Sequence, residues 1–252
     1  MHKNFWTRSK SGTLETRNLD RESRSFNFPD FWEGKYDIYN YLWWEMFGCY
    51  EFDSNGCDYE RGNCQIREGD VVLDLGANIG AFAHRAEFRG ASKVYSFEPI
   101  IETFECLKLN RGPKTKIFNI GVSGKSGFER FILEGDFNSM GSGRMEKNPN
   151  GSNNLIYDEY SYIVDINEVL SLDRFDFMKV DIEGCEYSLL DSITDENLSK
   201  IRCLALEFHN PEIDDIYLPQ FNSRISNLGF TSFTLYRNYG LTTVTCSKNF
   251  NS

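Results

Sequence analysis

The sequence predicts an α/β fold in which a mostly parallel sheet carries helices on both faces and ends in an antiparallel hairpin. Short apolar runs alternate with helix-like segments after residue 66, and this alternation is typical of a parallel sheet. Near the end of the chain, segments 231–236 and 241–247 have strand character and flank Arg237-Asn238-Tyr239-Gly240. That arrangement is typical of a β-hairpin.

The first expected element is the apolar run 71–75, which is rich in valine and leucine and therefore suits a buried strand. Pro99 would end the strand that follows and begin the next helix, and Gly229 suits the end of the last helix. In chain order we expect strand 71–75, helix 80–89, strand 93–97, helix 100–110, strand 115–121, helix 165–170, strand 175–180, helix 186–193, strand 201–208 and helix 216–227, with further strand character in 128–133 and 160–164.

Three segments of different composition divide the chain. Residues 1–30 are polar and rich in serine, arginine and asparagine, which predicts a flexible tail. Residues 31–65 are dense in aromatic side chains, and we expect one or two helices that pack on the domain, with an aromatic lid over an acceptor as the alternative. Residues 66–252 form the α/β domain. Within it, the long polar loop 136–154 is expected to lie near the active site and to order when ligands bind.

The composition excludes several classes of protein. The chain has 252 residues, of which 40% are hydrophobic, enough for one domain with a full core. Its net charge of −11 argues against nucleic acid as a partner and against anionic membranes, because both require a basic face. No apolar run reaches the ~18 residues of a membrane span. With no secretory signal and seven scattered cysteines, we expect a cytoplasmic protein with reduced thiols.

The turn after the first strand is the most informative feature. Asp74 ends the strand, and Gly76-Ala77-Asn78-Ile79-Gly80 leads into the first helix. Glycines let a ligand approach the backbone closely, and the start of a helix offers N–H groups to anionic parts of a ligand. The turn lacks the lysine of a P-loop and the three glycines of the dinucleotide fingerprint. An ordinary turn of an α/β protein is the alternative.

A second acid, Glu98, ends the next apolar strand about twenty residues further on. An acid at this position suits the two hydroxyls of a ribose. A lone acid here would more often be a solvated charge at the end of a strand. Combined with the Asp74 turn, it favours a ligand that contains ribose.

With these residues the chain resembles the FkbM family of S-adenosylmethionine-dependent methyltransferases. The matching stretches are Leu73-Asp74-Leu75-Gly76-Ala77-Asn78-Ile79-Gly80, Phe97-Glu98-Pro99, Leu107-Lys108-Leu109-Asn110, Asn119-Ile120-Gly121-Val122-Ser123, Phe177-Met178-Lys179-Val180-Asp181-Ile182-Glu183-Gly184-Cys185-Glu186 and Leu206-Glu207-Phe208-His209. The resemblance covers roughly residues 66–235 and implies a Rossmann-like class I methyltransferase fold with S-adenosyl-L-methionine as cofactor. One departure is Gly121, where the family usually has alanine, a change at the floor of the adenine pocket.

The resemblance and the positions at strand ends together predict the cofactor site. Asp74 and the glycine turn would hold the methionine part, and Glu98 the ribose. The residues expected to bind the cofactor are Asp74, Gly76, Asn78, Gly80, Glu98, Gly121, Ser123 and Asp181.

The carboxyl ends of two later strands carry the candidate catalytic groups. Asp181, Glu183 and Glu207 would crowd together there, which requires a positive group nearby. His209 is the candidate general base, because the ordinary pKa of imidazole lies nearest neutral pH, and Asp181 would orient the donor or the acceptor. We expect no metal. The alternative is Mg²⁺ held by Asp181 and Glu207, with or without His209.

The function expected from these features is O-methylation of a hydroxyl on a sugar or other small molecule. The acceptor would be a small molecule or a glycan. A noncatalytic adenosylmethionine-binding domain is the first alternative, and an NAD(P)-dependent oxidoreductase the second, since a ribose-binding acid is common to both classes of enzyme. The sequence gives no indication of the oligomeric state.

Overall fold

The computed structural model describes residues 6–8, 13–17, 23–27, 59–134, 144–145, 155–236 and 242–248. The aromatic stretch up to residue 58, most of the loop 136–154 and the hairpin turn 237–240 therefore lie outside the described residues. The helices expected for 31–58, the ordering of the long loop and the turn remain predictions.

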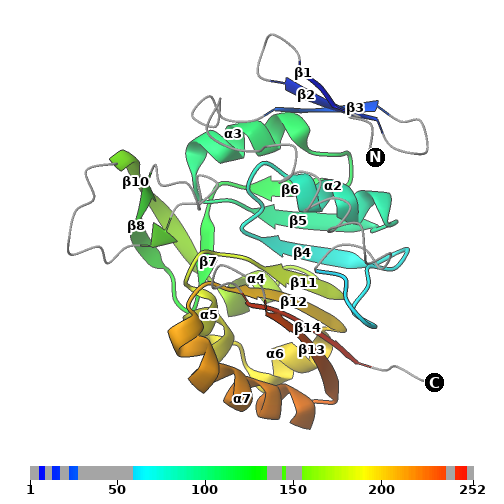
Figure 1. Cartoon of the computed structure of the whole chain (residues 1–252), viewed down its shortest axis with the longest axis vertical. Helices are drawn as coiled ribbons and strands as arrows, with labels where there is room; N and C mark the ends of the chain where they lie inside the picture. Colours follow the sequence, from blue (N-terminus) through cyan, green and yellow to red (C-terminus); the bar gives the residue numbers. More distant parts are fainter. Residues whose placement is uncertain are drawn as a thin grey trace.

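A seven-stranded sheet forms the centre of the molecule (Figure 1). Its order is β13-β14-β12-β11-β4-β5-β6. The strands β6, β5, β4, β11 and β12 pair in parallel, whereas β14 is antiparallel to both of its neighbours. The predicted mostly parallel sheet with a C-terminal antiparallel hairpin is thus confirmed. The strands are β4 (Val71–Leu75), β5 (Lys93–Phe97), β6 (Thr115–Phe118), β11 (Phe177–Val180), β12 (Cys203–Phe208), β13 (Phe230–Tyr236) and β14 (Thr242–Lys248).

Helices pack on both faces of this sheet. The apolar side chains of β4 alternate between the faces, so Val72 joins a core beneath α2, and Leu73 joins a larger core with α4, α5, α6 and α7. A strand buried on both faces is expected to be mostly apolar, and β4 is apolar except at Asp74. The helices are α2 (Ala81–Phe88), α3 (Ile101–Asn110), α4 (Ile166–Leu170), α5 (Glu186–Ser192), α6 (Asp195–Lys200) and α7 (Pro211–Asn227).

A second sheet projects beside the carboxyl ends of the parallel strands (Figure 1). It has the order β7-β10-β8-β9, and its main pair, β8 and β10, is antiparallel. The strand character expected for 128–133 and 160–164 is therefore confirmed. Its strands are β7 (Gly121–Ser123), β8 (Gly127–Glu134), β9 (Arg144–Met145) and β10 (Leu155–Asp165).

The N-terminal segment contains three short antiparallel strands that the sequence analysis did not predict. They are β1 (Trp6–Arg8), β2 (Thr13–Arg17) and β3 (Ser23–Asn27). Asn27 holds β3 against α3, because its backbone and side-chain N–H groups both donate to Asn110 Oδ1, at 2.7 and 3.0 Å. The expectation of a tail without regular structure therefore differs from the structure in these thirteen residues. The predicted mobility of residues 1–30 stays a prediction.

Element boundaries differ from the predictions where side chains cap the backbone. Helix α7 begins at Pro211 instead of residue 216, because the Asn210 side chain accepts hydrogen bonds from the N–H groups of Glu212 and Ile213. The short helix α6 was missed; Thr194 caps it in the same way. Among the described helices, none is both long and apolar enough to cross a membrane.

The strand order reverses direction between β4 and β11, which is where an open α/β sheet binds its ligand. From β4 the chain proceeds outward through β5 to β6, and it later returns to β11 on the other side of β4. The turn that follows β4 and the residues that follow β11 therefore lie side by side. A methyl group placed on Gly76 would come within 1.7 Å of the Asp181 carbonyl oxygen.

Candidate active site

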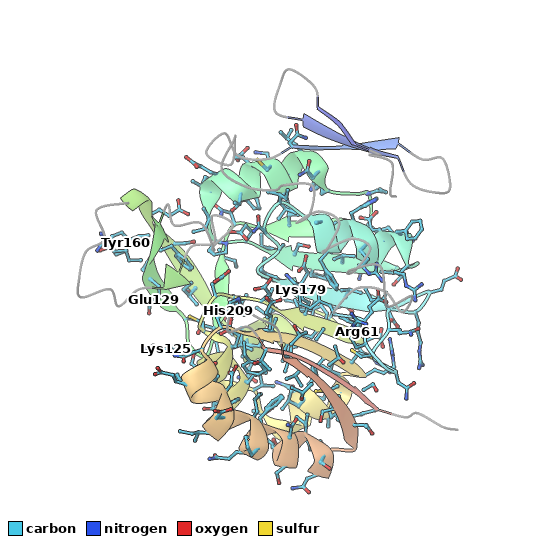
Figure 2. All side chains as sticks on the ribbon, viewed as in Figure 1. Arg61, Lys125, Glu129, Tyr160, Lys179 and His209 are labelled. Atoms are coloured by element: carbon cyan, nitrogen blue, oxygen red, sulfur yellow. The ribbon has the colours of Figure 1, made fainter. Side chains whose placement is uncertain are left out.

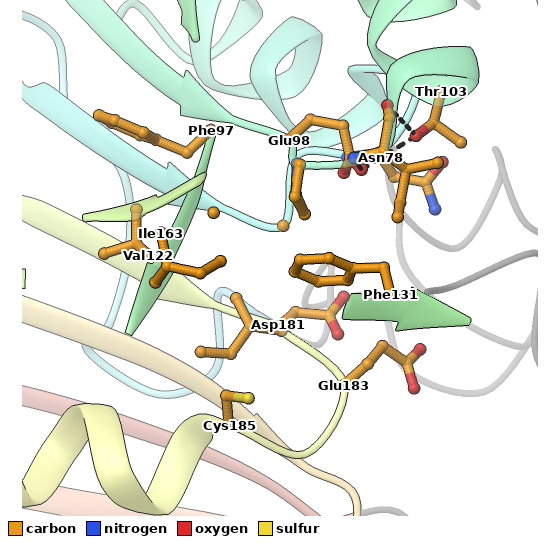
Figure 3. Close-up of a pocket in the computed structure, with 15 residues that line it drawn as sticks. Asn78, Phe97, Glu98, Thr103, Val122, Phe131, Ile163, Asp181, Glu183 and Cys185 are labelled. Carbon is orange, nitrogen blue, oxygen red and sulfur yellow. Dashed lines mark hydrogen bonds between the residues drawn. The ribbon is translucent and has the colours of Figure 1, made fainter. Parts of the chain in front are cut away.

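A pocket of about 620 Å³, its open mouth included, lies at this reversal point. Figure 3 shows Asn78 and Glu98 on one side of it and Asp181 and Glu183 on the other. Five of the predicted cofactor-binding residues line the pocket: Gly76, Asn78, Glu98, Gly121 and Asp181. The small sheet contributes apolar walls, Phe131 from β8 and Ile163 from β10, so the pocket combines apolar walls with a few polar groups, as small-molecule sites do.

Glu98 is a buried carboxyl held by three donors. Its two oxygens accept hydrogen bonds from the backbone N–H groups of Asn78 (2.8 Å) and Ile100 (2.9 Å) and from the Thr103 hydroxyl (2.9 Å). Burial raises the pKa of Glu98 to about 7, in spite of these hydrogen bonds, which act in the opposite direction. The side chain is therefore held rigidly, and it is close to the change between neutral and charged forms at physiological pH.

The turn after β4 is shaped by backbone conformation. Gly76 has a φ of +73° and Asn78 a φ of +50°, both in the left-handed region. The N–H groups of Gly76 and Ala77 both donate to the Phe97 carbonyl, at 3.0 Å each, which ties the turn to β5. Asn78 Oδ1 is buried and accepts no hydrogen bond from any described residue. A buried acceptor at a pocket wall is suited to a donor on a ligand.

Asp74 lies beneath the pocket and does not belong to its described lining. Its side chain has no exposed surface, and it accepts a hydrogen bond from the Ser96 hydroxyl (3.1 Å). Burial raises its pKa, while Lys179 and Ser96 act against that shift. In this position the Asp74 carboxyl supports, through Lys179, the residues that form the pocket. The direct cofactor contact expected for Asp74 stays a prediction.

Lys179, on β11, is the positive group that the crowded acids require. Its side chain is only 2% exposed, and its Nζ lies 3.6 Å from Asp74 Oδ1 and 3.4 Å from Asp181 Oδ2. The same ammonium donates to the Gly76 carbonyl at 3.0 Å. The single ammonium of Lys179, labelled in Figure 2, therefore contacts the end of β4, the glycine turn and the residue after β11.

Asp181 and Glu207 are connected by a hydroxyl. Tyr59 OH lies 3.0 Å from Asp181 Oδ2 and 2.6 Å from Glu207 Oε2, within donating distance of both. Burial by itself raises the pKa of Asp181, but Lys179, His209 and the Tyr59 hydroxyl together hold it below its ordinary value. Asp181 is therefore a carboxylate at neutral pH.

His209 follows β12 and is almost completely buried, at 8% exposure. Its Nδ1 forms a 2.8 Å hydrogen bond with Glu186, a fully buried carboxylate at the start of α5. Its Nε2 faces Asp181 Oδ1 at 3.6 Å and Glu183 Oε1 at 3.7 Å. Burial lowers the pKa of His209, but the surrounding carboxylates, Glu183 first, raise it well above its ordinary value.

Two predicted cofactor residues lie away from the pocket lining. Gly80 precedes α2, where an added Cβ would come within 2.7 Å of Leu107 Cδ1, so it permits α3 to pack closely. Ser123 ends β7 and lies 3.3 Å from the Ser188 hydroxyl, in a separate hollow. Both positions shape the surroundings of the pocket, and direct contact with a cofactor remains a prediction for them.

Three residues of the site, Lys179, Tyr59 and Glu186, were not among those predicted from the sequence. A lysine within the apolar strand 175–180 was a visible signal, because a buried charge requires a partner. Tyr59 gave no signal of its own in an aromatic-rich stretch. Glu186 was part of the quoted Asp-Ile-Glu-Gly-Cys-Glu motif, but its contact with His209 depends on the tertiary fold.

Similarity to solved structures is distant. An rRNA methylase from Streptococcus thermophilus matches with 12% identity and a TM-score of 0.44, over 73% of this chain and 89% of that chain. A ribosomal protein L11 methylase from Lactobacillus delbrueckii subsp. bulgaricus matches with 14% identity and a TM-score of 0.42, over 76% and 74% of the two chains. With TM-scores this low, the fold assignment depends on the strand order described above.

Similarity in sequence is more specific. The AMB antimetabolite synthetase AmbE of Pseudomonas aeruginosa is 27% identical over 189 residues, which cover 60% of this chain and 9% of that protein. The chain thus spans less than a tenth of the length of this curated relative. The family model described as the methyltransferase FkbM domain matches residues 74–232, well over half of the chain. The chain belongs to the FkbM methyltransferase family.

Proposed function

We propose that this protein transfers a methyl group from S-adenosylmethionine to a hydroxyl of a sugar or another small molecule. The observation that carries the proposal is the pocket at the reversal of strand order, lined by Gly76, Asn78, Glu98 and Asp181, in a chain of the FkbM methyltransferase family. Oxygen-rich pockets of this kind suit a ligand with hydroxyl and amino donors.

The residues present fit this cofactor. Glu98 offers a carboxyl to the ribose hydroxyls, and the buried Asn78 Oδ1 offers an acceptor that no described residue uses. Gly76 and Gly121 leave the walls without side chains: a Cβ on Gly121 would come within 2.4 Å of Ile163 Cδ1. The cofactor would therefore be held by Gly76, Asn78, Glu98 and Asp181, with Gly121 forming part of the wall.

When bound, the cofactor supplies a methyl group whose bond to sulfur breaks, with the electron pair kept by sulfur, as the acceptor oxygen bonds to its carbon. The chain must hold the acceptor in line and take up the hydroxyl proton. His209 and Asp181 are the groups proposed for this step, since Nε2 of His209 faces Asp181 beside the pocket. To accept the proton, the imidazole must be neutral when the acceptor arrives.

The charge around the site restricts the acceptor. Asp181, Glu183 and Glu207 surround His209, and the whole chain carries −11. A polyanion such as nucleic acid would be repelled, whereas a neutral or cationic compound with hydroxyl groups would not. We therefore propose a small-molecule or glycan acceptor. We also propose that the reaction takes place in the cytoplasm.

Binding measurements would test the proposal. Calorimetry should show that adenosylmethionine binds and that NADH and NADPH do not, which separates a methyltransferase from an oxidoreductase. Glu98→Ala should weaken binding about tenfold to a hundredfold, the effect of losing a charge-assisted hydrogen bond worth about 1.5–3 kcal/mol. Glu105→Ala is the matched control, because Glu105 is an exposed acid on the adjacent helix α3.

Methyl transfer itself separates an enzyme from a noncatalytic binding domain. The measurement is transfer of a labelled methyl group to a panel of sugars and small alcohols, with the product identified by mass spectrometry. Adenosylmethionine binding that is equal in wild type and Glu98→Ala would remove the ribose assignment. Tight nicotinamide binding without adenosylmethionine binding would overturn the proposal as a whole.

A further inference from the structure

Three side chains beside the pocket form a mixed group of oxygen and nitrogen donors. Asp181, Glu183 and His209 each offer one atom, and these atoms all lie within 4.8 Å of one another. Nε2 of His209 is 3.6 Å from Asp181 Oδ1 and 3.7 Å from Glu183 Oε1. Neighbouring ligands of a six-coordinate ion with bonds of about 2.1 Å lie about 3 Å apart. The two distances from His209 Nε2 exceed this spacing by less than 1 Å.

A separate feature presents the His209 nitrogen as a ligand. Nδ1 is hydrogen-bonded to Glu186 at 2.8 Å, and Glu186 is itself fixed by the Gly184 N–H at 2.9 Å. A carboxylate on one ring nitrogen keeps the proton there and leaves the lone pair of the other nitrogen for a metal, the arrangement usual behind metal-binding histidines. The side chain is more than nine-tenths buried, and no described residue forms a hydrogen bond with Nε2.

Asp181, like His209, is held by residues outside the group of three donors. Its Oδ2 lies 3.0 Å from the Tyr59 hydroxyl and 3.4 Å from Lys179 Nζ, so these groups occupy the side of the carboxylate that faces the sheet. Oδ1 is left facing His209. Two of the three donors are thus held by residues outside the group, and those residues determine which atom points inward.

Acidic side chains predominate around the three donors. Five acidic side chains, Asp74, Asp181, Glu183, Glu186 and Glu207, lie around the basic side chains of Lys179 and His209. Lys179 approaches Asp181 at Oδ2, whereas His209 approaches it at Oδ1. Crowded carboxylates are stabilised by a bound cation.

We propose that Asp181, Glu183 and His209 bind one divalent first-row transition ion. Two carboxylates and one imidazole suit Mn²⁺ or Fe²⁺, because purely hard ions such as Mg²⁺ favour oxygen alone. Three protein ligands leave open positions, and Asp181 and Glu183 line the pocket. The acceptor hydroxyl would occupy an open position. With the ion bound, the ion would replace His209 as the group that activates this hydroxyl, because Nε2 cannot bind the ion and accept a proton at the same time. That role rests on the proposed function, whereas binding of the ion does not.

The proposed ligand set differs from the Mg²⁺ alternative that the sequence left open beside the expectation of no metal. Glu207 was a ligand in that alternative, but its Oε2 accepts a hydrogen bond from Tyr59, and its Oε1 lies 4.0 Å from His209 Nε2. Glu183 takes that place. Its backbone has a φ of +53°, followed by Gly184 at +104°, and this tight turn brings the carboxylates of residues 181 and 183 to the same histidine.

Mn²⁺ titration of the full chain, after treatment with chelator and without any cofactor, would test the site. The electron paramagnetic resonance signal of free Mn²⁺ disappears on binding, so it counts bound ions directly. We expect one site, with affinity lowered about tenfold or more in Glu183→Gln and in His209→Gln. Asp215→Asn, an exposed acid on α7, is the matched control and should bind like wild type.

Circular dichroism would confirm that each variant is folded, and Glu183→Gln alters a partly exposed side chain that bears little on the core. Absence of Mn²⁺ binding by the wild type, or equal binding in all four proteins, would overturn the proposal. The two proposals fail separately. Ion binding without methyl transfer to any hydroxyl would remove only the function, and full methyl transfer in excess chelator, with no ion bound, would remove only the site.

Discussion

Glu98 should make the stability of the ligand-free protein depend on pH in a predictable direction. Its pKa in the folded protein is about 7, against an ordinary value of 4.5, because burial disfavours the charged form. Below pH 4.5 the carboxyl is protonated in both the folded and the unfolded chain, so it does not lower the free energy of unfolding. As pH rises from 4.5 towards 7 the unfolded chain loses its proton first, so the folded state is progressively destabilised.

The expected loss of stability follows from the pKa shift of Glu98. A difference of about 2.5 pKa units at about 1.36 kcal/mol each gives a loss of about 3 kcal/mol, complete above pH 7. Glu98→Gln cannot titrate. Its free energy of unfolding minus that of wild type should therefore increase by about 3 kcal/mol between pH 4.5 and 7.5 and then stay constant.

Urea unfolding at four or five pH values measures this difference directly. Glu105→Gln, on the exposed face of α3, is the control for a general effect of removing an acid, and its difference from wild type should remain nearly flat. A flat difference for Glu98→Gln as well would refute the raised pKa. If adenosylmethionine binds the charged form, its affinity should also rise with pH up to about 7, by at most about tenfold per pH unit, and level off above it.

Three further substitutions test the construction of the site. Gly76→Ala should cost more than about 3 kcal/mol of stability in urea unfolding, because its Cβ would overlap a backbone oxygen, whereas Gly229→Ala, also at positive φ but with open space around it, should cost only about 1–2 kcal/mol. Lys179→Met should destabilise the fold by about 3–5 kcal/mol, since it leaves buried carboxylates without their cation; a loss under 1 kcal/mol would show that the carboxylates are neutral. Gly121→Ala should keep the fold but push the end of Ile163 aside, which lies 2.4 Å from the new methyl, and lower cofactor affinity severalfold in calorimetry, a cost of about 0.5–1.5 kcal/mol; unchanged affinity would show that this wall does not touch the cofactor.

The alternation of apolar runs and glycine turns was sufficient to predict the central sheet. Strands β4 and β5 have the predicted bounds, because a strand buried on both faces is marked by its composition alone. The missed helix α6 depends on a single capping hydroxyl, that of Thr194, and such local hydrogen bonds are common in loops as well. The N-terminal strands escaped prediction because polar residues dominate them and no alternation marks them.

The candidate site could be predicted to the level of strand ends and no further. Parallel strands bring their carboxyl ends to one edge of the sheet, so Asp181, Glu183, Glu207 and His209 were expected together. Which acid faces His209 depends on features that strand positions do not contain, above all on Tyr59, 122 residues away in sequence from Asp181.

Tyr59 also explains why the acids divide into two groups. Its hydroxyl joins Glu207 to Asp181 Oδ2 on the α2 face of the sheet, where Lys179 supplies the positive charge. Glu183 and Asp181 Oδ1 remain on the pocket side with His209. In the network on the sheet side, Tyr59, Lys179 and Glu207 are buried and hydrogen-bonded or charge-paired, which favours rigidity, whereas the carboxylates on the pocket side border the space for a ligand. Asp181 belongs to both groups. When a ligand binds the pocket-side oxygen Oδ1, the interaction of Asp181 with Lys179 should therefore change. Because Lys179 donates a hydrogen bond to the Gly76 carbonyl, the position of the glycine turn at the cofactor pocket should change with it.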